Sequence, residues 1–181
     1  MKLYIVRHGQ SEWNALHRVC GATDSPLTEK GRAQAAETAA KVAEMTKDHP
    51  IDLIIVSPRS RALDTGKAIQ AACGDPPLIM DERLREINFG DNEGRDTRDP
   101  DFQAEKRIFP RRHPNGESML EFTHRIYGFL DEIRVRYPDK TVLLACHNGI
   151  LRTAQSYFYD MTNEEFMSYV VKNASVSVYE L

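Results

Sequence analysis

Short apolar runs alternate with helix-like segments along the whole chain. Three of these runs, at 3–6, 51–56 and 141–146, are continuous and rich in β-branched residues. Each is followed by a polar break and then by a stretch of helical composition. Runs that are apolar at every position are typical of parallel strands buried on both faces. Their alternation with helices predicts an α/β sheet that has helices on both faces.

Residues that commonly begin helices follow these runs. Thr28 is a suitable N-cap for a segment rich in Ala, Glu and Lys, which are good helix formers. After the second run, Ser57 can cap a helix, and Pro58 suits its first position. Ser118 and Glu121 have the spacing of a capping box, which predicts another helix start. The remaining predicted elements are the rest of that helix to about 136 and strands at 77–80 and 175–181.

The stretch from 88 to 115 departs from this pattern. It is strongly charged and shows little apolar periodicity. Unpatterned inserts of this length in compact domains are typically lids or binding loops. A chain of 181 residues has the length of one domain with a substantial core. We therefore predict a single domain over 1–181, with a lid-like insert at about 88–115.

Composition and charge narrow the class of protein. Apolar residues make up 41% and charged residues 28% of the chain, which indicates a globular fold. A formal net charge of −3 argues against the basic surface that nucleic-acid binding needs. No apolar run has the length of a membrane span or a signal-peptide core. Cys20, Cys73 and Cys146 have no paired spacing, so we expect free thiols in a cytoplasmic protein that binds neither nucleic acid nor membranes.

Charged and polar residues gather where the predicted strands end. In open α/β sheets, ligands bind beyond the carboxyl ends of the strands. If these ends lie side by side, one pocket receives two imidazoles, at least two guanidiniums and a carboxyl group. The residues are Arg7 and His8 after the first strand, Arg59 and Arg61 after the second, His147, Asn148 and Gly149 after the third, and Glu86 after the strand at 77–80.

This set of side chains suits phosphoryl transfer. Arginine offers a planar fork that matches phosphate oxygens, and amides at helix starts add further donors. An imidazole nitrogen can accept the phosphoryl group covalently, which divides one difficult displacement into two easier steps. A carboxyl group near a phosphate has its pKa raised by the like charge, so it can donate a proton to the leaving oxygen. Because arginines neutralise the phosphate, no metal is required.

Each residue also has an ordinary structural interpretation. Taken singly, a strand-end histidine, an arginine on a helix or a glutamate on a loop is more often structural or solvated, and a surface ion pair contributes little to stability. The argument therefore depends on their coincidence at strand ends. The histidines outside that context, which we interpret as structural, are His17, His49, His113 and His124.

The same stretches also contain residues that other kinds of site would use. His8, Glu86 and His147 could form a three-ligand metal site, but the neighbouring arginines would repel a dication and no zinc-motif spacing is present. Cys146 precedes His147, and adjacent strand residues point to opposite faces, which disfavours a Cys–His dyad. A basic group in the insert could attract an anionic substrate, although a solvated face is the favoured interpretation; it comprises Lys106, Arg107, Arg111 and Arg112.

Five segments resemble those of one known family. They are RHGQSEWN, SPLTEKGRAQA, SPRSRALDTG, LREINFG and ACHNG, and in this order they resemble the histidine phosphatase superfamily over nearly the whole chain. That family includes bisphosphoglycerate-dependent phosphoglycerate mutases and many small phosphatases. The resemblance implies a three-layer α/β/α fold of the phosphoglycerate mutase type. Its mostly parallel sheet would have six strands, one of them antiparallel.

The resemblance also implies roles for individual residues. His8 would be the nucleophile that becomes phosphohistidine, and Glu86 would be the proton donor. The residues that would grip the phosphate are Arg7, Asn14, Arg61 and His147.

Further substrate contacts are expected around the pocket. Relatives often have a polar side chain where this chain has Cys20, so a backbone contact is favoured at that position. The residues expected to bind substrate here are Arg18, Cys20, Gly21 and Asn148.

The implied reaction is either hydrolysis or return of the phosphoryl group to a product. A mutase must keep water from its phosphohistidine, and the mutases that the chain resembles carry a longer insert after the acidic glutamate. Here 30 positions separate Glu86 from Gly116 (116 − 86). This spacing favours a phosphatase that acts on a small phosphorylated metabolite without a cofactor.

Two alternatives stay open at this point. One is a phosphoglycerate mutase that uses bisphosphoglycerate as its primer. The other is a non-catalytic module that binds phosphorylated ligands, which is disfavoured because the expected catalytic set is intact. The oligomeric state, monomer or homodimer, also stays open.

Overall fold

Five strands form one mixed sheet in the computed structural model, which describes residues 1–180. The strand order is β3-β2-β4-β1-β5. The pairs β1–β4, β2–β4 and β2–β3 are parallel, and β5 is antiparallel to β1. This arrangement confirms the predicted α/β class and the single antiparallel strand. The strands are β1 (Lys2–Arg7), β2 (Leu53–Val56), β3 (Leu78–Met80), β4 (Thr141–Cys146) and β5 (Val176–Glu180).

The strand number differs from the six that the family resemblance implied. Each of the five β-rich runs identified in the sequence is a strand, and residues 1–180 contain no sixth. The outer edge of the sheet is the three-residue strand β3, where Ile79 and Met80 are 44% and 62% exposed. The chain that follows β3 forms short 3₁₀ turns and charged loops. This segment has no continuous apolar run that could form a further strand.

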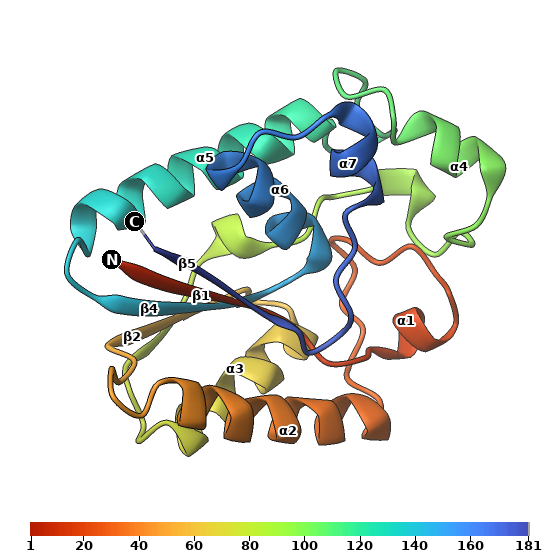
Figure 1. Ribbon diagram of the computed structural model, residues 1–181. Helices are drawn as coiled ribbons and strands as arrows, with labels where there is room; N and C mark the ends of the chain where they lie inside the picture. The colour runs from red at the N-terminus through yellow and green to blue at the C-terminus, as the bar shows by residue number, and fades with distance from the viewer. Residues whose placement is uncertain (181) are drawn as a thin grey trace.

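Helices cover both faces of the sheet (Figure 1). On one face lie α5 and α6, and on the other lie α2 and α3. The short helices α1 and α4 lie at the end where β1 finishes. The helices are α1 (Glu12–Ala15), α2 (Glu29–Met45), α3 (Ser60–Ala72), α4 (Pro100–Glu105), α5 (Met119–Arg136), α6 (Asn148–Phe158) and α7 (Asn163–Ser168), with 3₁₀ turns at Glu82–Leu84 and Gly90–Asn92.

Two of the three predicted helix starts are confirmed. The Thr28 hydroxyl accepts from the Gly31 amide at the start of α2, and Ser118 and Glu121 form a capping box at α5. The prediction for α3 is wrong, because its N-cap is Arg59 and no side chain caps it. Ser57 instead directs its hydroxyl to a histidine of the site described below.

The core lies in two layers on either side of β1 and β4. Alternate residues of a strand face opposite sides, so Leu3 and Ile5 pack with α5 and α6, whereas Tyr4 and Val6 pack with α2 and α3. All six residues of β4 are buried, as predicted for a central parallel strand. Burial of each such aliphatic side chain contributes about 1.5–3 kcal/mol. This packing fixes the strand ends from which the site is built.

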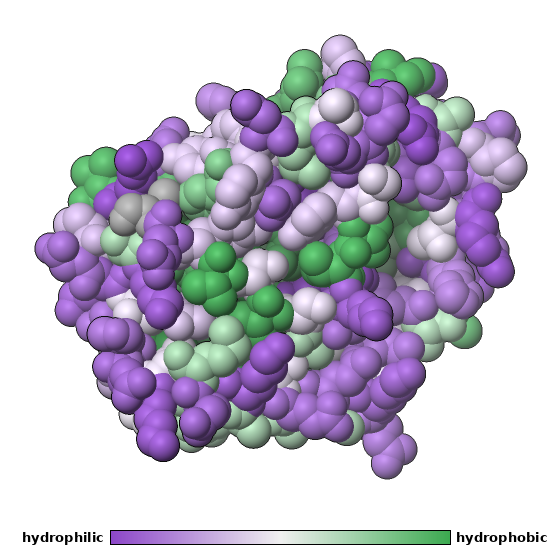
Figure 2. All heavy atoms as spheres, in the orientation of Figure 1, coloured by the Kyte–Doolittle hydropathy of each residue, from purple (hydrophilic) through white to green (hydrophobic). Residues whose placement is uncertain are grey.

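Some apolar side chains remain exposed on the face seen in Figure 2. They gather along β5 and the segment that follows α7, and they include Val170 and Val178, which are 65% and 39% exposed. No helix within residues 1–180 has both the length and the apolar character needed to cross a membrane.

Candidate active site

The carboxyl ends of β1, β4 and β2 bring two histidines together. The His8 amide donates to the Cys146 carbonyl at 3.0 Å, which continues the β1–β4 ladder past the last strand residue. The ring centroids of His8 and His147 lie 5.1 Å apart, edge to face. Their exposed fractions are 3% and 0%. The predicted convergence of strand ends therefore places both imidazoles in one buried site.

Hydrogen bonding defines the tautomer of His8. Its Nδ1 lies 2.6 Å from the Gly9 carbonyl oxygen, which can only accept, so the neutral ring carries its proton on Nδ1. Burial, reinforced by the charges of Arg61 and Arg7, holds the pKa of His8 well below its usual range. Nε2 therefore carries a free lone pair, and this is the nitrogen that a nucleophilic imidazole needs.

His147 is neutral for similar reasons. Burial, followed by the charge of Arg61, holds its pKa well below the usual range. Its Nε2 lies 2.8 Å from the Ser57 hydroxyl, whereas its buried Nδ1 has no hydrogen-bond partner within the described chain. A buried polar atom left unpaired is costly, which points to a ligand contact at this nitrogen.

Two guanidiniums, one buried and one half-buried, lie beside the histidines. Arg61 is 1% exposed, and its two terminal nitrogens donate to the carbonyls of Thr23 and Gly21, at 2.9 Å each. Arg7 donates to the Val171 carbonyl, and burial is the main cause that lowers its pKa. The Nε atoms of both arginines are buried and unpaired. Buried positive charge without close carboxylate pairing favours the binding of an anion.

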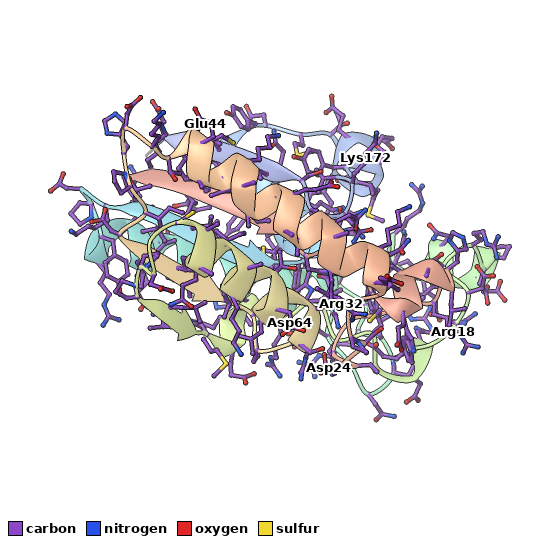
Figure 3. The ribbon with its side chains drawn as sticks, turned by 90° about the horizontal axis from the view of Figure 1, so that it is seen from below. Arg18, Asp24, Arg32, Glu44, Asp64 and Lys172 are labelled. Carbon is purple, nitrogen blue, oxygen red and sulfur yellow. The ribbon has the colours of Figure 1, made fainter. Side chains whose placement is uncertain are left out.

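The carboxylate nearest to Arg61 is on Asp24, a 4.0 Å contact at the molecular surface. Asp24 also accepts from the amide and hydroxyl of Ser60 at the start of α3. Figure 3 shows Asp24 at the same end of the molecule as Arg18, whereas Glu44 lies at the far end of α2. The positive charge of Arg61 is therefore only partly compensated.

Glu86 is held at the start of α6. One of its oxygens accepts from the Gly149 amide at 2.9 Å, and the other accepts from the Ile87 amide at 3.0 Å. A Cβ atom at position 149 would lie 2.2 Å from the Glu86 carboxylate. Only glycine allows this close approach, so Gly149 sets the position of the predicted acid.

A second glutamate, which the sequence did not single out, organises the loop under Arg61. The Glu93 carboxylate accepts from the amides of Gly21 and Ala22 at 2.9 Å each, and from those of Thr23 and Phe89 at 3.4 and 3.1 Å. The carbonyls of the same loop accept from Arg61. Both backbone polar groups of Gly21 are thereby used, so its observed role is to hold Arg61.

Three asparagines connect separate parts of the site. Asn173, also absent from the sequence predictions, donates to the His8 carbonyl and to the Asn14 side-chain oxygen, at 3.1 Å each. Asn14 additionally completes the capping box of α1. Asn148 accepts from the Val171 amide at 3.0 Å. These contacts occupy the amide oxygens of Asn14 and Asn148 and leave their NH₂ groups for a ligand.

A cavity of about 500 Å³ adjoins these groups, a size typical of small-molecule sites. Arg7 and Glu86 line it, whereas His8, Arg61 and His147 are buried next to them. Besides Arg7, the residues predicted to bind substrate that line the cavity are Asn14, Arg18, Cys20 and Asn148.

The insert supplies much of the cavity wall. It contributes Phe89, Phe102 and Lys106, and α6 contributes Arg152. Of the histidines interpreted as structural, His17 lies on the wall, and His113 is buried in the insert against Phe89. Within residues 1–180, no three His, Cys, Asp or Glu side chains come together as a metal site requires.

Comparisons with known proteins agree with this geometry. Residues 3–181 match a family model described as histidine phosphatase superfamily (branch 1). The chain is 35% identical over 147 residues to a Bacillus subtilis protein named uncharacterized phosphatase PhoE, and the match covers 81% of this chain and 72% of that protein. It is 37% identical over 158 residues to the probable phosphoglycerate mutase GpmB of Cronobacter sakazakii, covering 83% and 71%.

A solved structure with the same fold is a phosphatase whose name specifies its substrate. It is the mycobacterial glucosyl-3-phosphoglycerate phosphatase, which superposes with a TM-score of 0.80 at 28% sequence identity. The match covers 98% of this chain and 88% of that one.

Proposed function

Because the chain belongs to the histidine phosphatase superfamily, we propose that it is a phosphatase that hydrolyses a small phosphate monoester through a phosphohistidine on His8. The observation that carries this proposal is the state of His8. It is a neutral, buried imidazole with Nε2 free, beside two guanidiniums that lack close carboxylate partners. An imidazole in this state can attack phosphorus, and the fixed positive charge stabilises the transferring group.

The first step forms a bond between Nε2 of His8 and phosphorus and breaks the bond from phosphorus to the leaving oxygen. Glu86 gives its proton to that oxygen, which leaves as an alcohol. A bound phosphate disfavours a charged carboxylate close by, so substrate binding itself promotes protonation of Glu86. His8 is only 3% exposed, so a side chain beside it must move before a phosphate can reach Nε2. We expect Arg7 to make this movement by turning from the Val171 carbonyl toward the entering phosphate.

The second step returns the enzyme to its starting state. Glu86 takes a proton from water as the water oxygen attacks phosphorus, and the bond to Nε2 breaks. Inorganic phosphate is then the product, and the imidazole is again neutral. Arg7, Arg61 and His147 would hold the phosphoryl oxygens in both steps, with the unpaired Nδ1 of His147 aimed at one of them.

Hydrolysis is preferred over mutase chemistry because the cover over the site is small. Between Glu86 and α5, the described chain has a single α-helix, the six-residue α4. A mutase needs water kept from its phosphohistidine, and an insert of this size gives little cover. The probable phosphoglycerate mutase among its relatives keeps that reaction as the alternative.

The test is to trap the intermediate. Enzyme mixed with a ³²P-labelled monoester and quenched should contain an acid-labile, base-stable phosphoenzyme, and free phosphate should accumulate. The His8→Ala variant should form none and should lose about 10⁴-fold or more in turnover, whereas His124→Ala, at an exposed position on α5, should retain both. Undiminished labelling of His8→Ala would refute the assignment.

Two further measurements define the reaction. Activity is expected to survive treatment with EDTA, and loss of activity that added metal restores would contradict the proposed chemistry. Conversion of 3-phosphoglycerate to its 2-isomer, dependent on added bisphosphoglycerate and faster than phosphate release, would establish the mutase alternative.

A further inference from the structure

Two positively charged side chains line the same cavity as Glu86. Arg152 is three residues after Gly149 on α6, so it lies on the same side of that helix as the amide that holds Glu86. Lys106 follows directly after α4 in the insert. Both line the cavity. Arg152 is 8% exposed and Lys106 is half-buried.

Neither side chain forms an ion pair within residues 1–180. The Nε atom of Arg152 donates to the Tyr169 carbonyl at 3.2 Å, and its guanidinium lies 5.7 Å from the Phe166 ring centre. The Nζ atom of Lys106 lies 5.9 Å from the Phe102 ring centre. Among residues 1–180, no carboxylate lies within 4.0 Å of either cation. Four other arginines of the insert do form ion pairs with carboxylates. These ion pairs are Arg95–Asp99, Arg98–Asp96, Arg111–Glu105 and Arg112–Glu121.

The paired arginines of the insert and the two cavity cations differ in how much they would gain from an anionic partner. An exposed arginine gains little from an ion pair because water already solvates it. A cation that is buried without a partner loses its solvation and gains nothing in return. Burial, with the charges of Arg152 and Arg107 added, lowers the pKa of Lys106 to about 8. Burial also lowers the pKa of Arg152, and the charge of Glu86 offsets only part of that effect. An anion placed between the two cations would relieve this cost.

We propose that Arg152 and Lys106 form a second anion subsite that selects monoesters whose leaving group carries a carboxylate or a second phosphate. The inference rests on the proposed function, because it takes Glu86 as the donor to the leaving oxygen. That oxygen then lies at Glu86, and the leaving group extends past it toward Arg152 and Lys106. A second negative charge a few bonds from the ester oxygen is therefore favoured, and a neutral leaving group leaves both cations unpaired.

The experiment compares three esters of similar size. Carboxymethyl phosphate carries a carboxylate, ethylene glycol bisphosphate carries a second phosphate, and 2-hydroxyethyl phosphate carries neither. We expect kcat/KM to be at least tenfold higher for one or both anionic esters than for the neutral one. The first two esters show which anion the subsite prefers. Equal kcat/KM values for all three, with hydrolysis intact, would overturn the subsite and leave the proposed function standing.

Substitutions assign the preference to the two cations. Lys106→Met should reduce the ratio of anionic to neutral kcat/KM by about tenfold, and Lys106→Arg should restore it. Arg152→Lys should retain part of the preference, whereas Arg152→Met should lose it. Lys41→Met, on the exposed face of α2, removes one positive charge elsewhere and should leave the ratio unchanged. An unchanged ratio in Lys106→Met and Arg152→Met would refute the subsite.

The pH dependence gives a readout that loss of packing would not mimic. Because kcat/KM reports ionisation of the free enzyme, the preference for an anionic leaving group should decline as the pH rises through about 8, where Lys106 loses its proton. In Lys106→Arg the preference should persist to higher pH. A pH-independent ratio in the parent enzyme would contradict a role for the Lys106 charge.

A binding measurement separates the two hypotheses. If no ester is hydrolysed and no phosphoenzyme forms, the proposed function fails. Calorimetric titration of His8→Ala with carboxymethyl phosphate and with 2-hydroxyethyl phosphate still decides the subsite. At least tenfold tighter binding of the anionic ester supports it, and equal binding refutes it.

Discussion

The two walls of the cavity are built in different ways. The wall at the strand ends is formed by Arg7, with His8 and His147 buried behind it, and the pairing of β1 with β4 fixes Arg7 and His8. The opposite wall belongs to the insert at 88–115, which contributes no strand to the sheet and is held together by local backbone turns and by side-chain contacts. Asn92 is central to it, since it contacts Glu105, Arg95 and His113 at 3.0, 2.6 and 3.0 Å.

This difference suggests a division of work between the walls. In-line attack on phosphorus needs positions held to within a fraction of an ångström, and a sheet ladder in a packed core provides that. Recognition of a leaving group needs charges and shape that can vary among relatives, and loops tolerate such change. Substitutions at the strand ends should therefore affect the rate with every substrate, whereas substitutions in the insert should affect mainly the choice of substrate.

Among the substitutions that test this division, the largest effect is expected for Glu86→Gln, which retains the shape of the side chain but cannot donate the acid proton. Turnover of alkyl phosphates should fall by about 10²–10⁴-fold. With p-nitrophenyl phosphate the loss should be smaller, because nitrophenolate leaves without a proton. Steady-state kinetics with both esters gives the two losses. Equal losses with both esters would contradict the proton-donor role of Glu86.

Gly149→Ala tests the position of the same carboxylate without removing it. The added Cβ atom would lie 2.2 Å from the Glu86 carboxylate, so Glu86 must move. A displacement of about 1 Å can cost roughly 10²-fold in rate, and we expect a loss of that order in kcat for an alkyl phosphate.

The control for this change is Gly128→Ala, at a helical position in α5 where a Cβ atom meets nothing within 4 Å. It should leave kcat unchanged and raise the free energy of unfolding by about 0.5–1 kcal/mol. A Gly149→Ala enzyme with full activity would show that Glu86 does not need its present position.

Glu93→Gln probes the point where the two walls meet, since Glu93 belongs to the insert and holds the loop that positions Arg61. Glutamine keeps only one acceptor oxygen, so some of the loop amides lose their partner. Hydrogen bonds to a charged group contribute about 1.5–3 kcal/mol to stability. We expect the free energy of unfolding, measured by urea denaturation, to fall by about that amount.

Activity of Glu93→Gln should fall about tenfold with every ester, as expected when Arg61 is displaced. Glu82→Gln is the matched control, because Glu82 is exposed and pairs only with Arg85 at the surface. A change in substrate preference at constant overall activity would instead place Glu93 with the selective wall.

The smallest effect concerns the pH dependence of stability in the insert. Burial lowers the pKa of His113, so the folded state favours the neutral imidazole. The stabilisation that follows is complete above the ordinary histidine pKa of about 6.5. It is lost as the pH falls from there through the lowered pKa of the folded protein. The free energy of unfolding should therefore decrease as the pH is lowered from about 7.5 to about 5.5.

His113→Asn should make that decrease shallower, whereas His124→Asn, at an exposed position, should not. Urea denaturation at several pH values measures the slope, to which His8 and His147 contribute in the same direction. An identical slope in His113→Asn would show that the insert does not sense pH through this residue.

The sequence predicted most of the sheet and the approach of its functional side chains. Continuous apolar runs identify buried strands, and Thr28 and Ser118 identify helix starts. Both signals depend only on residues that are close together in the sequence. The convergence of Arg7, His8, Arg61, Glu86 and His147 followed from one further rule, that parallel strands present their carboxyl ends at the same edge. Local pattern and that rule together determined which side chains meet in the site.

Only the tertiary structure decided how those side chains are held and what else lies beside them. The sixth strand and the Ser57 cap were wrong because sheet extent and cap choice depend on long-range packing. Glu93, Arg152 and Asn173 escaped notice, and Lys106 was interpreted as part of a solvated face although it is half-buried in the cavity, because each acts on residues far away in the chain. Their contacts depend on the path of loops that have no periodic pattern, so their roles emerge only once the chain has folded.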